Sequence, residues 1–562
     1  MRDERRRRKE EERREISTTK IWDLYEKGKD QHTHVNMYDD TEREYAFYEG
    51  DQWRYAKTGG EELPVLNIIK PVVKYKVATI AQNTMAIVYS SMSGDETTIK
   101  VCEELSKFAA SQWEKMKMDT VAWDVIKCAC ITGDHYAYFF DASDRSGGLM
   151  VDPVIKLGVR LINKTNVYFS DEQNPNIDEQ EWIIISERIP VDSVKKIAKD
   201  RKVPDEEIEK IVTDDNTDDQ IGQDAADEVS GTGKCTSLLY MSIKEDGLHF
   251  CRSVKSVVYE PEQVVPIKIY PLAGMRWETK VGDSRGLSAV KGMIANQLEI
   301  NKTAARRAIA VKRYSYPTLV YDMDRVANVD DLDTVGAKIA IENLATNGVG
   351  SVIQYLSPAA ISNNASELQN EMIALTQQLE GAGDAALGQV DPEKTSGEAI
   401  KAARDAAAVP LNEQYAAYKQ FVEDVAMIWY RLWVAYSPAG LFINYFDGDN
   451  VVQEVIEPAA LENIDMMIRI DVSPIDPYSR LSQEASLGNL LAGQYITFEE
   501  YVEALSDDSG VPKAKLKKIL DERKAQQEAQ MQQMPPEMMM QEQMVEETPE
   551  GGEAIDLSAL QM

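Results

Sequence analysis

The sequence predicts an α+β fold that is mainly helical, and three observations support this prediction. Runs rich in β-branched and aromatic residues recur between about residue 135 and residue 258, as expected for strands. Later segments repeat apolar residues at helical spacing. The chain has 562 residues, of which 43% are hydrophobic, with 25 Tyr and 8 Trp. This composition allows several buried cores and argues against general disorder.

The N-terminal half is expected to combine a charged start with an α+β region. Residues 1–40 mix charges of both signs and are predicted to form a charged arm, helical or loose. Residues 41–283 form the predicted α+β region, in which the acidic residues 205–228 are expected to be a surface loop. Helices are expected there at 72–85, 96–131 and 191–199, and strands at 135–140, 155–162, 167–169, 182–185, 236–242 and 249–258.

The next part of the chain is expected to be two helices that flank a small segment. The first helix is predicted over residues 284–313, and Pro317 stops it. Residues 314–356 follow as a compact segment with two short strands. A return helix is expected within residues 357–382, and a Gly/Ala-rich loop over residues 383–396.

Residues 397–506 are predicted to contain a long helix kinked at Pro410, a hairpin over 442–456 and a further helix over 481–505. A stripe of large side chains at helical spacing follows Pro410, and we expect it to be buried core. Its members are Leu411, Tyr415, Tyr418, Val422, Val425, Trp429, Leu432 and Tyr436. Residues 507–562 are expected to be a charged helix followed by a disordered, Met-rich acidic tail.

The charge balance excludes a conventional nucleic-acid grip. Lys and Arg total 62 against 95 Asp and Glu, which gives a formal net charge of −33. Such a polyanion is repelled by phosphate backbones and by anionic membrane surfaces. No run reaches the roughly 18 apolar residues that a membrane helix requires. The start of the sequence carries no apolar secretory core, so we expect neither a secretory signal nor a membrane partner.

No catalytic site, metal or cofactor is predicted. The nearest nucleotide motif ends in Gly231-Thr-Gly-Lys-Cys-Thr236, but Glu228 stands at the required first Gly and Cys235 at the required hydroxyl. An EF-hand begun at Asp214 lacks its Gly and its Glu. The five Cys show no disulfide-framework or CxxC spacing, which predicts buried free thiols, and the four His have no visible metal or nucleophile partner. We therefore expect a protein that is not an enzyme.

One local inversion of charge is a candidate site. The basic patch, in the second half of the first long helix, comprises Lys302, Arg306, Arg307, Lys312 and Arg313. These residues complement the helix dipole and the acidic surroundings in one interpretation. In another, they face DNA phosphates or a neighbouring subunit. The sequence leaves both interpretations open.

Several short motifs follow one another in a fixed order along the chain. They are Phe47-Tyr-Glu-Gly-Asp-Gln-Trp53, the Asn67-Ile pair, Asn163-Lys-Thr-Asn-Val-Tyr-Phe169 with Asp171, and Thr395-Ser-Gly-Glu-Ala399. These motifs, and the order of the predicted elements, resemble the portal proteins of tailed double-stranded DNA bacteriophages, most closely those of short-tailed phages. The resemblance spans about residues 40–506, with Asn174-Pro175 in place of the family's Asp-Pro turn.

The resemblance implies a homo-oligomeric ring, usually of twelve copies, at one vertex of the capsid. Such a ring is assembled in the host cytoplasm, remains in the virion, and is the channel for genome packaging and ejection. Expected partners are the terminase large subunit, the tail adaptor or head completion protein, the major capsid and scaffolding proteins, and double-stranded DNA in transit. In the family's terms, residues 284–313 and 357–382 are the stem, 314–356 the clip, 41–283 and 397–506 the wing, and 507–562 the crown.

The resemblance also assigns residues 383–396 to a channel loop near the passing duplex. Small or acidic residues at and just before this loop would follow DNA without gripping it, and an acidic wall would repel the duplex over about 8 Å at physiological salt. These residues are Gly381, Gly383, Asp384, Ala385, Ala386 and Gly388. Two other classes stay open: a packaging ATPase or nuclease, and a cellular or viral helical scaffold or adaptor protein without a DNA channel.

Overall fold

The computed structural model describes most of the chain. The chain divides into two compact units, Met1–Ser473 and Pro474–Met562. The described residues are 2–54, 56, 63–92, 95–142, 155–214, 233–315, 318–332, 334, 336–342, 344, 348–356, 364–383, 406–438, 440–447, 450–458, 461, 466–474, 487–488, 490–493, 495–504, 515–518 and 520.

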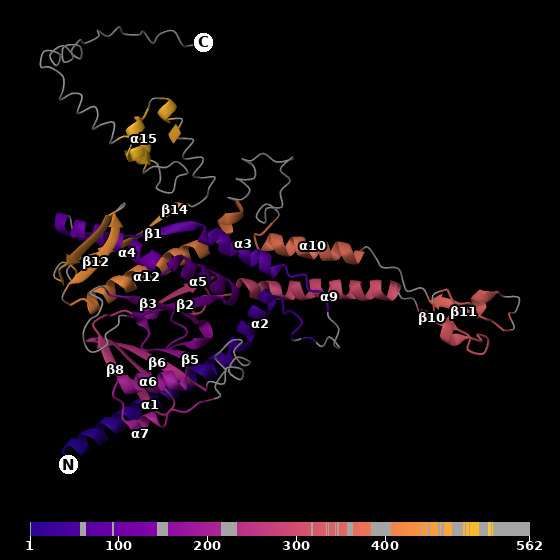
Figure 1. Cartoon of the computed structure of the whole chain (residues 1–562), viewed down its shortest axis with the longest axis horizontal. Coiled ribbons are helices and arrows are strands. Elements are labelled where there is room, and N and C mark those ends of the chain that lie inside the picture. The colour runs from indigo at the N-terminus through magenta and orange to yellow at the C-terminus, as the bar shows by residue number, and fades with distance from the viewer. Residues whose placement is uncertain are drawn as a thin grey trace, which may run out of the picture. The chain divides into compact units, whose positions relative to one another are not determined.

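The first unit is a mixed α/β structure in which helices predominate (Figure 1). Its main helices are α1 (Arg2–His34), α2 (Met37–Glu49), α3 (Ile69–Ala81), α4 (Glu96–Lys115), α5 (Met118–Thr132), α6 (Val191–Asp200), α7 (Asp205–Ile208), α9 (Ala289–Ser315), α10 (Asn364–Leu379) and α12 (Asn412–Tyr436). The predicted charged arm thus begins as the long helix α1. Among the described residues, no helix is both long and apolar enough to cross a membrane.

The described strands form five sheets, of which three have two strands, one has three and one has five. None of these sheets closes into a barrel. The strands are β1 (Asn83–Ser91), β2 (Asp134–Asp141), β3 (Leu157–Asn163), β4 (Val167–Phe169), β5 (Ile183–Pro190), β6 (Lys234–Lys244), β7 (Gly247–Ser253), β8 (Val258–Val265), β9 (Leu272–Arg276), β10 (Thr318–Tyr321), β11 (Ile353–Leu356), β12 (Leu441–Asp447), β13 (Asn450–Ile456) and β14 (Met466–Pro474).

The β-rich region forms a three-stranded sheet, in the order β3-β2-β9, and a five-stranded meander, β4-β5-β6-β7-β8. The strands expected from β-branched and aromatic runs are confirmed as β2 to β6, and β2, β4 and β6 are buried along most of their length. The predicted run 249–258 is the exception, since it contains the turn between β7 and β8. The hairpin predicted over 442–456 is confirmed as β12 paired with β13.

The core of the first unit lies around α12, as its stripe of large side chains predicts. Trp429 and Trp433 are both fully buried. The Trp429 ring lies 6.3 Å from the ring of Phe139 on β2, and the Trp433 ring lies 4.9 Å from that of Phe108 on α4. α12 thus joins the three-stranded sheet to the helical layer.

Two features of the N-terminal region differ from the predictions. The single helix expected over 96–131 is wrong, because Lys117 adopts a left-handed conformation with φ of 54° and separates α4 from α5. The helix expected over 72–85 ends at Ala81, and β1 follows it. β1 pairs with β14. A strand whose partner lies this far along the chain leaves little local signal.

The long helix α9 begins at Ala289, later than the predicted Ser284. The Ser288 hydroxyl accepts hydrogen bonds from the backbone N–H groups of Val290 (3.0 Å) and Lys291 (3.2 Å), which makes it the N-cap. A Cβ on Gly286 would lie 2.1 Å from the carbonyl oxygen of Gly133. The preceding residues therefore run as a linker pressed against the start of β2.

The remaining differences concern the acidic segment and the C-terminal unit. Residues 205–208 of the predicted acidic loop form α7, and residues 215–228 lie outside the described residues. In the second unit, α15 (Phe498–Ala504) begins with a reciprocal capping box between Thr497 and Glu500. The chain is not helical at 495–497, so a continuous helix over 481–505 is wrong. The predicted tail beyond residue 520 lies outside the described residues.

Candidate functional site

The candidate site is the antiparallel pair of helices α9 and α10, together with the short β10–β11 pair that the chain forms between them (Figure 1). Asn296 Nδ2 on α9 donates to Thr376 Oγ1 on α10 at 3.1 Å, and Arg307 Nη1 donates to Gln369 Oε1 at 2.6 Å. Gln369 and Thr376 are both buried. Every buried residue of α9 lies at or before Ala305, so the second half of the helix is largely exposed.

Two fully buried amides anchor the base of α9 to an extended segment of the N-terminal region. Gln297 accepts a hydrogen bond from the Ile68 backbone N–H (2.9 Å) and donates to the Leu66 carbonyl (2.7 Å). Asn301 accepts from the Leu66 N–H (3.0 Å) and donates to Gln52 Oε1 (2.5 Å). The backbone groups of Leu66 and Ile68 are therefore hydrogen-bonded by side chains of α9, which take the place of a neighbouring strand.

The Gln-Trp motif noted in the sequence has a structural role in this anchor. Gln52 lies just beyond the end of α2, and its Nε2 donates to the Phe47 carbonyl at 2.8 Å. Trp53 Nε1 donates to the Pro64 carbonyl at 3.2 Å, and Asn67 Nδ2 donates to the Tyr48 carbonyl at 3.1 Å. The motif thus holds the turn after α2 against the segment that Gln297 and Asn301 bind.

Replacing Asn301 with Leu is expected to lower the free energy of unfolding by about 2 kcal/mol, because the Leu66 N–H loses its acceptor and the buried side-chain Oε1 of Gln52 loses its donor. Chemical denaturation followed by fluorescence measures this change. The matched control is Asn370→Leu, at an exposed position of α10, which should change stability by less than about 0.5 kcal/mol. Equal effects of the two substitutions would contradict the anchoring role.

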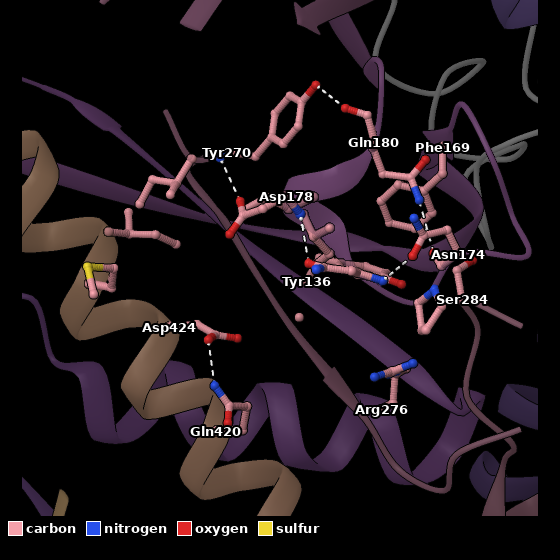
Figure 2. Close-up of a pocket in the computed structure, with 18 residues that line it drawn as sticks. Tyr136, Phe169, Asn174, Asp178, Gln180, Tyr270, Arg276, Ser284, Gln420 and Asp424 are labelled. Carbon is pink, nitrogen blue, oxygen red and sulfur yellow. Dashed lines mark hydrogen bonds between the residues drawn. The ribbon is translucent and has the colours of Figure 1, made fainter. Parts of the chain in front are cut away.

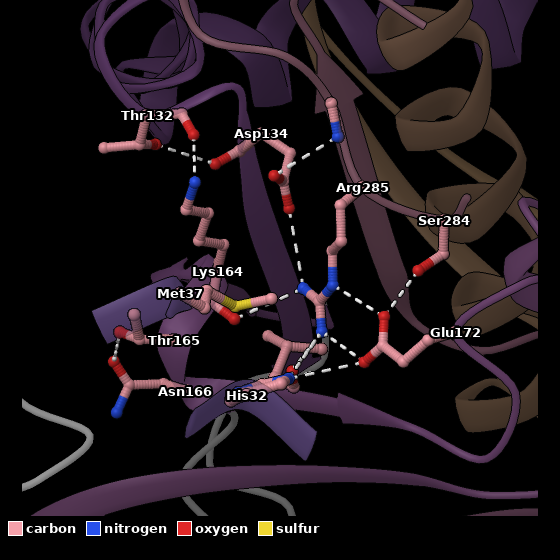
Figure 3. Close-up of polar contacts among 12 residues, drawn as sticks. His32, Met37, Thr132, Asp134, Lys164, Thr165, Asn166, Glu172, Ser284 and Arg285 are labelled. Carbon is pink, nitrogen blue, oxygen red and sulfur yellow. Dashed lines mark hydrogen bonds and ion pairs between the residues drawn. The ribbon is translucent and has the colours of Figure 1, made fainter. Parts of the chain in front are cut away.

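A second anchor, at the linker before α9, centres on Arg285 (Figure 3). Its guanidinium donates two hydrogen bonds to the carboxylate of Glu172, at 2.7 and 2.8 Å, and one to the Val167 carbonyl at 2.7 Å. It lies 3.5 Å from Asp134 Oδ2 and donates to His32 Nε2 at 3.2 Å. One side chain thereby connects α1, β2, the first residue of β4 and the loop after β4 to the start of α9.

The charges of this second anchor are fixed by their mutual contacts. Burial raises the pKa of Glu172, but Arg285 and the hydrogen bonds outweigh burial and hold that pKa well below its usual range. Burial lowers the pKa of Arg285, yet Glu172 reverses this, so the guanidinium stays protonated. Burial lowers the pKa of His32, which therefore accepts the Arg285 hydrogen bond as a neutral imidazole. The cluster is an ion pair with a neutral acceptor rather than a set of acid-base catalysts.

The basic patch divides between two faces of α9. Lys302 and Arg306 lie 3.5 and 3.3 Å from the carboxylate of Glu299 on the same helix, and Arg313 is exposed on the same side. Their spacing of four and eleven residues places all three within about 40° of one another around the helix axis. These three residues form what we call the basic face.

The other two members of the patch point elsewhere. Arg307 turns toward α10 and bonds Gln369, and Lys312 is exposed on a different side of the helix from Arg306. The structure therefore brings three of the five predicted residues together and gives Arg307 a role in holding the helix pair.

Gly381, predicted as part of the flexible loop residues, closes the end of α10. It adopts φ of +72°, its N–H donates to Gln378 O, and the N–H of Ala382 donates to Gln377 O. This is a Schellman motif, in which glycine is favoured because of its positive φ. The preceding Glu380 forms an ion pair of 2.5 Å with Lys76 on α3.

The start of the predicted channel loop is therefore fixed to the body of the first unit. Gly383 is the last described residue of this stretch and has open space around its Cα. The other predicted loop residues, Asp384, Ala385, Ala386 and Gly388, lie outside the described residues, as does the Thr395-Ser-Gly motif.

The first unit also contains a polar cavity of about 390 Å³ between the three-stranded sheet and α12 (Figure 2). Burial raises the pKa of Asp424, on α12, to about 6, and also raises the pKa of Asp178. Asp178 accepts from the Tyr270 N–H, and Gln420 donates to Asp424. Arg276 lines the same cavity. Ser284 also lines it, and its hydroxyl donates to Glu172 Oε2 at 2.6 Å.

In the part of the chain that the structure describes, no group of three or more His, Cys, Asp or Glu could hold a metal ion. The five Cys are free, as predicted, and burial raises the pKa of Cys235 to about 11. No protein-family model matches the chain, and a search of curated proteins finds no match either.

The residues that sequence reasoning missed are the buried polar ones. Gln297 and Asn301 stand four residues apart on the otherwise apolar face of α9, and such a pair is a readable signal of a buried polar contact. Arg285 offers no comparable signal. Its partners come from three distant segments, and only the folded chain brings them together.

Proposed function

We propose that this chain is a subunit of a phage portal: a ring of twelve copies that forms the channel for packaging and ejecting the genome. The observation that carries the proposal is the α9–α10 pair, an antiparallel hairpin with an exposed outer half and a small two-stranded element between its helices. A ring of such hairpins would line a tube, and the α+β region would surround it. The role is structural rather than catalytic.

The two anchors at the base of α9 suit such a tube. A channel wall needs stiff elements, and α9 is held at its base by the buried amides of Gln297 and Asn301 and by the Arg285 cluster. The net charge of −33 favours passage over adhesion, because a duplex slides only where persistent phosphate contacts are few.

The segment between the two helices is proposed to meet other proteins. Apolar side chains there are largely exposed, including Met323 (78%), Tyr355 (58%) and Leu356 (55%). Exposed apolar groups gathered on a small element are typical of binding surfaces. We assign this surface to the terminase large subunit and then the tail adaptor, in the virion's portal vertex, with capsid and scaffolding proteins meeting the wider part of the ring.

Negative-stain electron microscopy of the purified full chain tests the proposal. The expected images show rings with a central hole as wide as a DNA duplex. Monomers or rods would overturn the proposal and favour a scaffold or adaptor protein. ATP hydrolysis by the same preparation would instead favour a packaging ATPase.

A further inference from the structure

The helices α9 and α10 carry opposite charges. α9 contains six basic residues and one acidic residue, whereas α10 contains two acidic residues, Glu367 and Glu371, and no basic residue. Yet no ion pair joins the two helices among the described residues. The hydrogen bonds between them join Asn296 to Thr376, both neutral, and Arg307 to the neutral Gln369. Lys302 and Arg306 pair instead with Glu299 on α9 itself.

The acidic residues point away from α9. Gln369 and Thr376 mark the side of α10 that meets α9, because both are buried and both bond it. Glu367 and Glu371 lie four residues apart and about 160° to 200° around the axis from Gln369. They are exposed, and we call them the acidic face.

Lys302 and Arg306 of the basic face lie at about the same level along the hairpin as the acidic face. The bonds Asn296–Thr376 and Arg307–Gln369 tie the two helices at two heights. Lys302 and Arg306 fall between these bonds on α9. Glu371 falls between them on α10, and Glu367 lies half a turn beyond. Rotation about a ring axis parallel to the hairpin leaves heights unchanged, so these groups would lie at the same level in adjacent copies.

Exposed apolar side chains border the charged groups on both helices. Leu368, Leu375 and Leu379 repeat along one side of α10 and are 52%, 50% and 81% exposed. Ile309, 38% exposed, borders the basic face of α9. Leucines repeated at helical spacing form a stripe suited to a second helix, so the surface has both an apolar component and a charged one.

We propose that the basic face of α9, formed by Lys302, Arg306 and Arg313, docks on the acidic face of α10 in a neighbouring copy of this chain. The contact is head-to-tail, since each copy offers α9 to one neighbour and α10 to the other. It rests on the proposed ring and assigns these basic residues to a protein partner rather than to DNA.

The test uses two variants with reversed faces: Lys302→Glu with Arg306→Glu, and Glu367→Lys with Glu371→Lys. Each variant alone places like charges in contact, so neither should form rings in negative-stain images or sedimentation. A mixture of the two restores opposite charges at every contact. Rings in which the variants alternate are expected, and the chain that carries all four substitutions should form rings alone.

The control is Lys255→Glu with Lys268→Glu, an equal charge change at exposed positions outside α9 and α10. This variant should form rings as the natural chain does, and all variants should keep the natural melting temperature within about 2 °C because the changed residues are exposed.

The outcomes separate this inference from the proposed function. If the natural chain forms no rings, the portal proposal itself is wrong. Rings that persist in the Lys302→Glu, Arg306→Glu variant overturn only the docking, and if those rings also fail to package DNA, the basic face meets the duplex. Two variants that fail alone and fail again when mixed also overturn the docking.

Discussion

Replacing Arg285 with Ala is expected to lower the free energy of unfolding by about 3–5 kcal/mol. The substitution leaves the Glu172 carboxylate in a buried site without its cation, and it removes the donor that the Val167 carbonyl and His32 share. The Arg285 guanidinium also lies 4.7 Å from the ring centroid of Phe169, a cation–π contact that the variant loses. Chemical denaturation followed by tryptophan fluorescence is the measurement.

Two controls distinguish the loss of this ion pair from the loss of any arginine. Arg54→Ala removes an exposed arginine, paired with Glu42, and should change stability by less than about 1 kcal/mol. The double variant Arg285→Ala with Glu172→Ala should be more stable than Arg285→Ala alone, because no unpaired carboxylate remains buried. A double variant that is no more stable would contradict the electrostatic explanation.

Replacing Trp429 with Ala is expected to cost about 3–5 kcal/mol, since it opens a cavity where α12 meets the three-stranded sheet. The side chain is fully buried between the rings of Trp113, Phe139 and Trp433. Its Nε1 finds no hydrogen-bond acceptor among the described residues, so Trp429→Phe loses volume but no polar contact. That variant should cost clearly less than Trp429→Ala.

The matched control is Trp123→Ala, because Trp123 is 44% exposed on α5. Its loss should shift the thermal midpoint far less than the loss of Trp429 does. If the Phe variant is as unstable as the Ala variant, the indole nitrogen has a role that the packing of the ring does not explain.

Local patterns predicted the elements whose burial repeats along the chain. The stripe from Leu411 to Tyr436 predicted α12 because it marks one buried face, and the run from His135 to Phe140 predicted β2 because it is continuously buried. The break between α4 and α5 was not predicted, because Lys117 adopts the left-handed conformation without being a glycine and the helical spacing of apolar residues continues on either side of it. α9 was placed too early because its N-cap, Ser288, follows another Ser in the same short segment.

The site was predicted less completely than the fold, for a physical reason. Charge is visible in a sequence, so the basic patch could be found, but the sequence could not separate Arg307, which bonds α10, from Arg306, which faces outward. Arg285 was invisible because a buried ion pair depends on contacts between distant segments. Long-range electrostatic contacts carry no local period.

The pairing of β1 with β14 sets the order in which this chain can complete its fold. About 370 residues separate the two strands, so at ordinary rates of translation β1 waits on the order of 20 to 80 s for its partner. The first unit therefore closes only after β14 has been synthesised. Until then a nascent chain lacks this strand, which delays any self-association of the first unit and leaves an open strand edge for chaperones to cover.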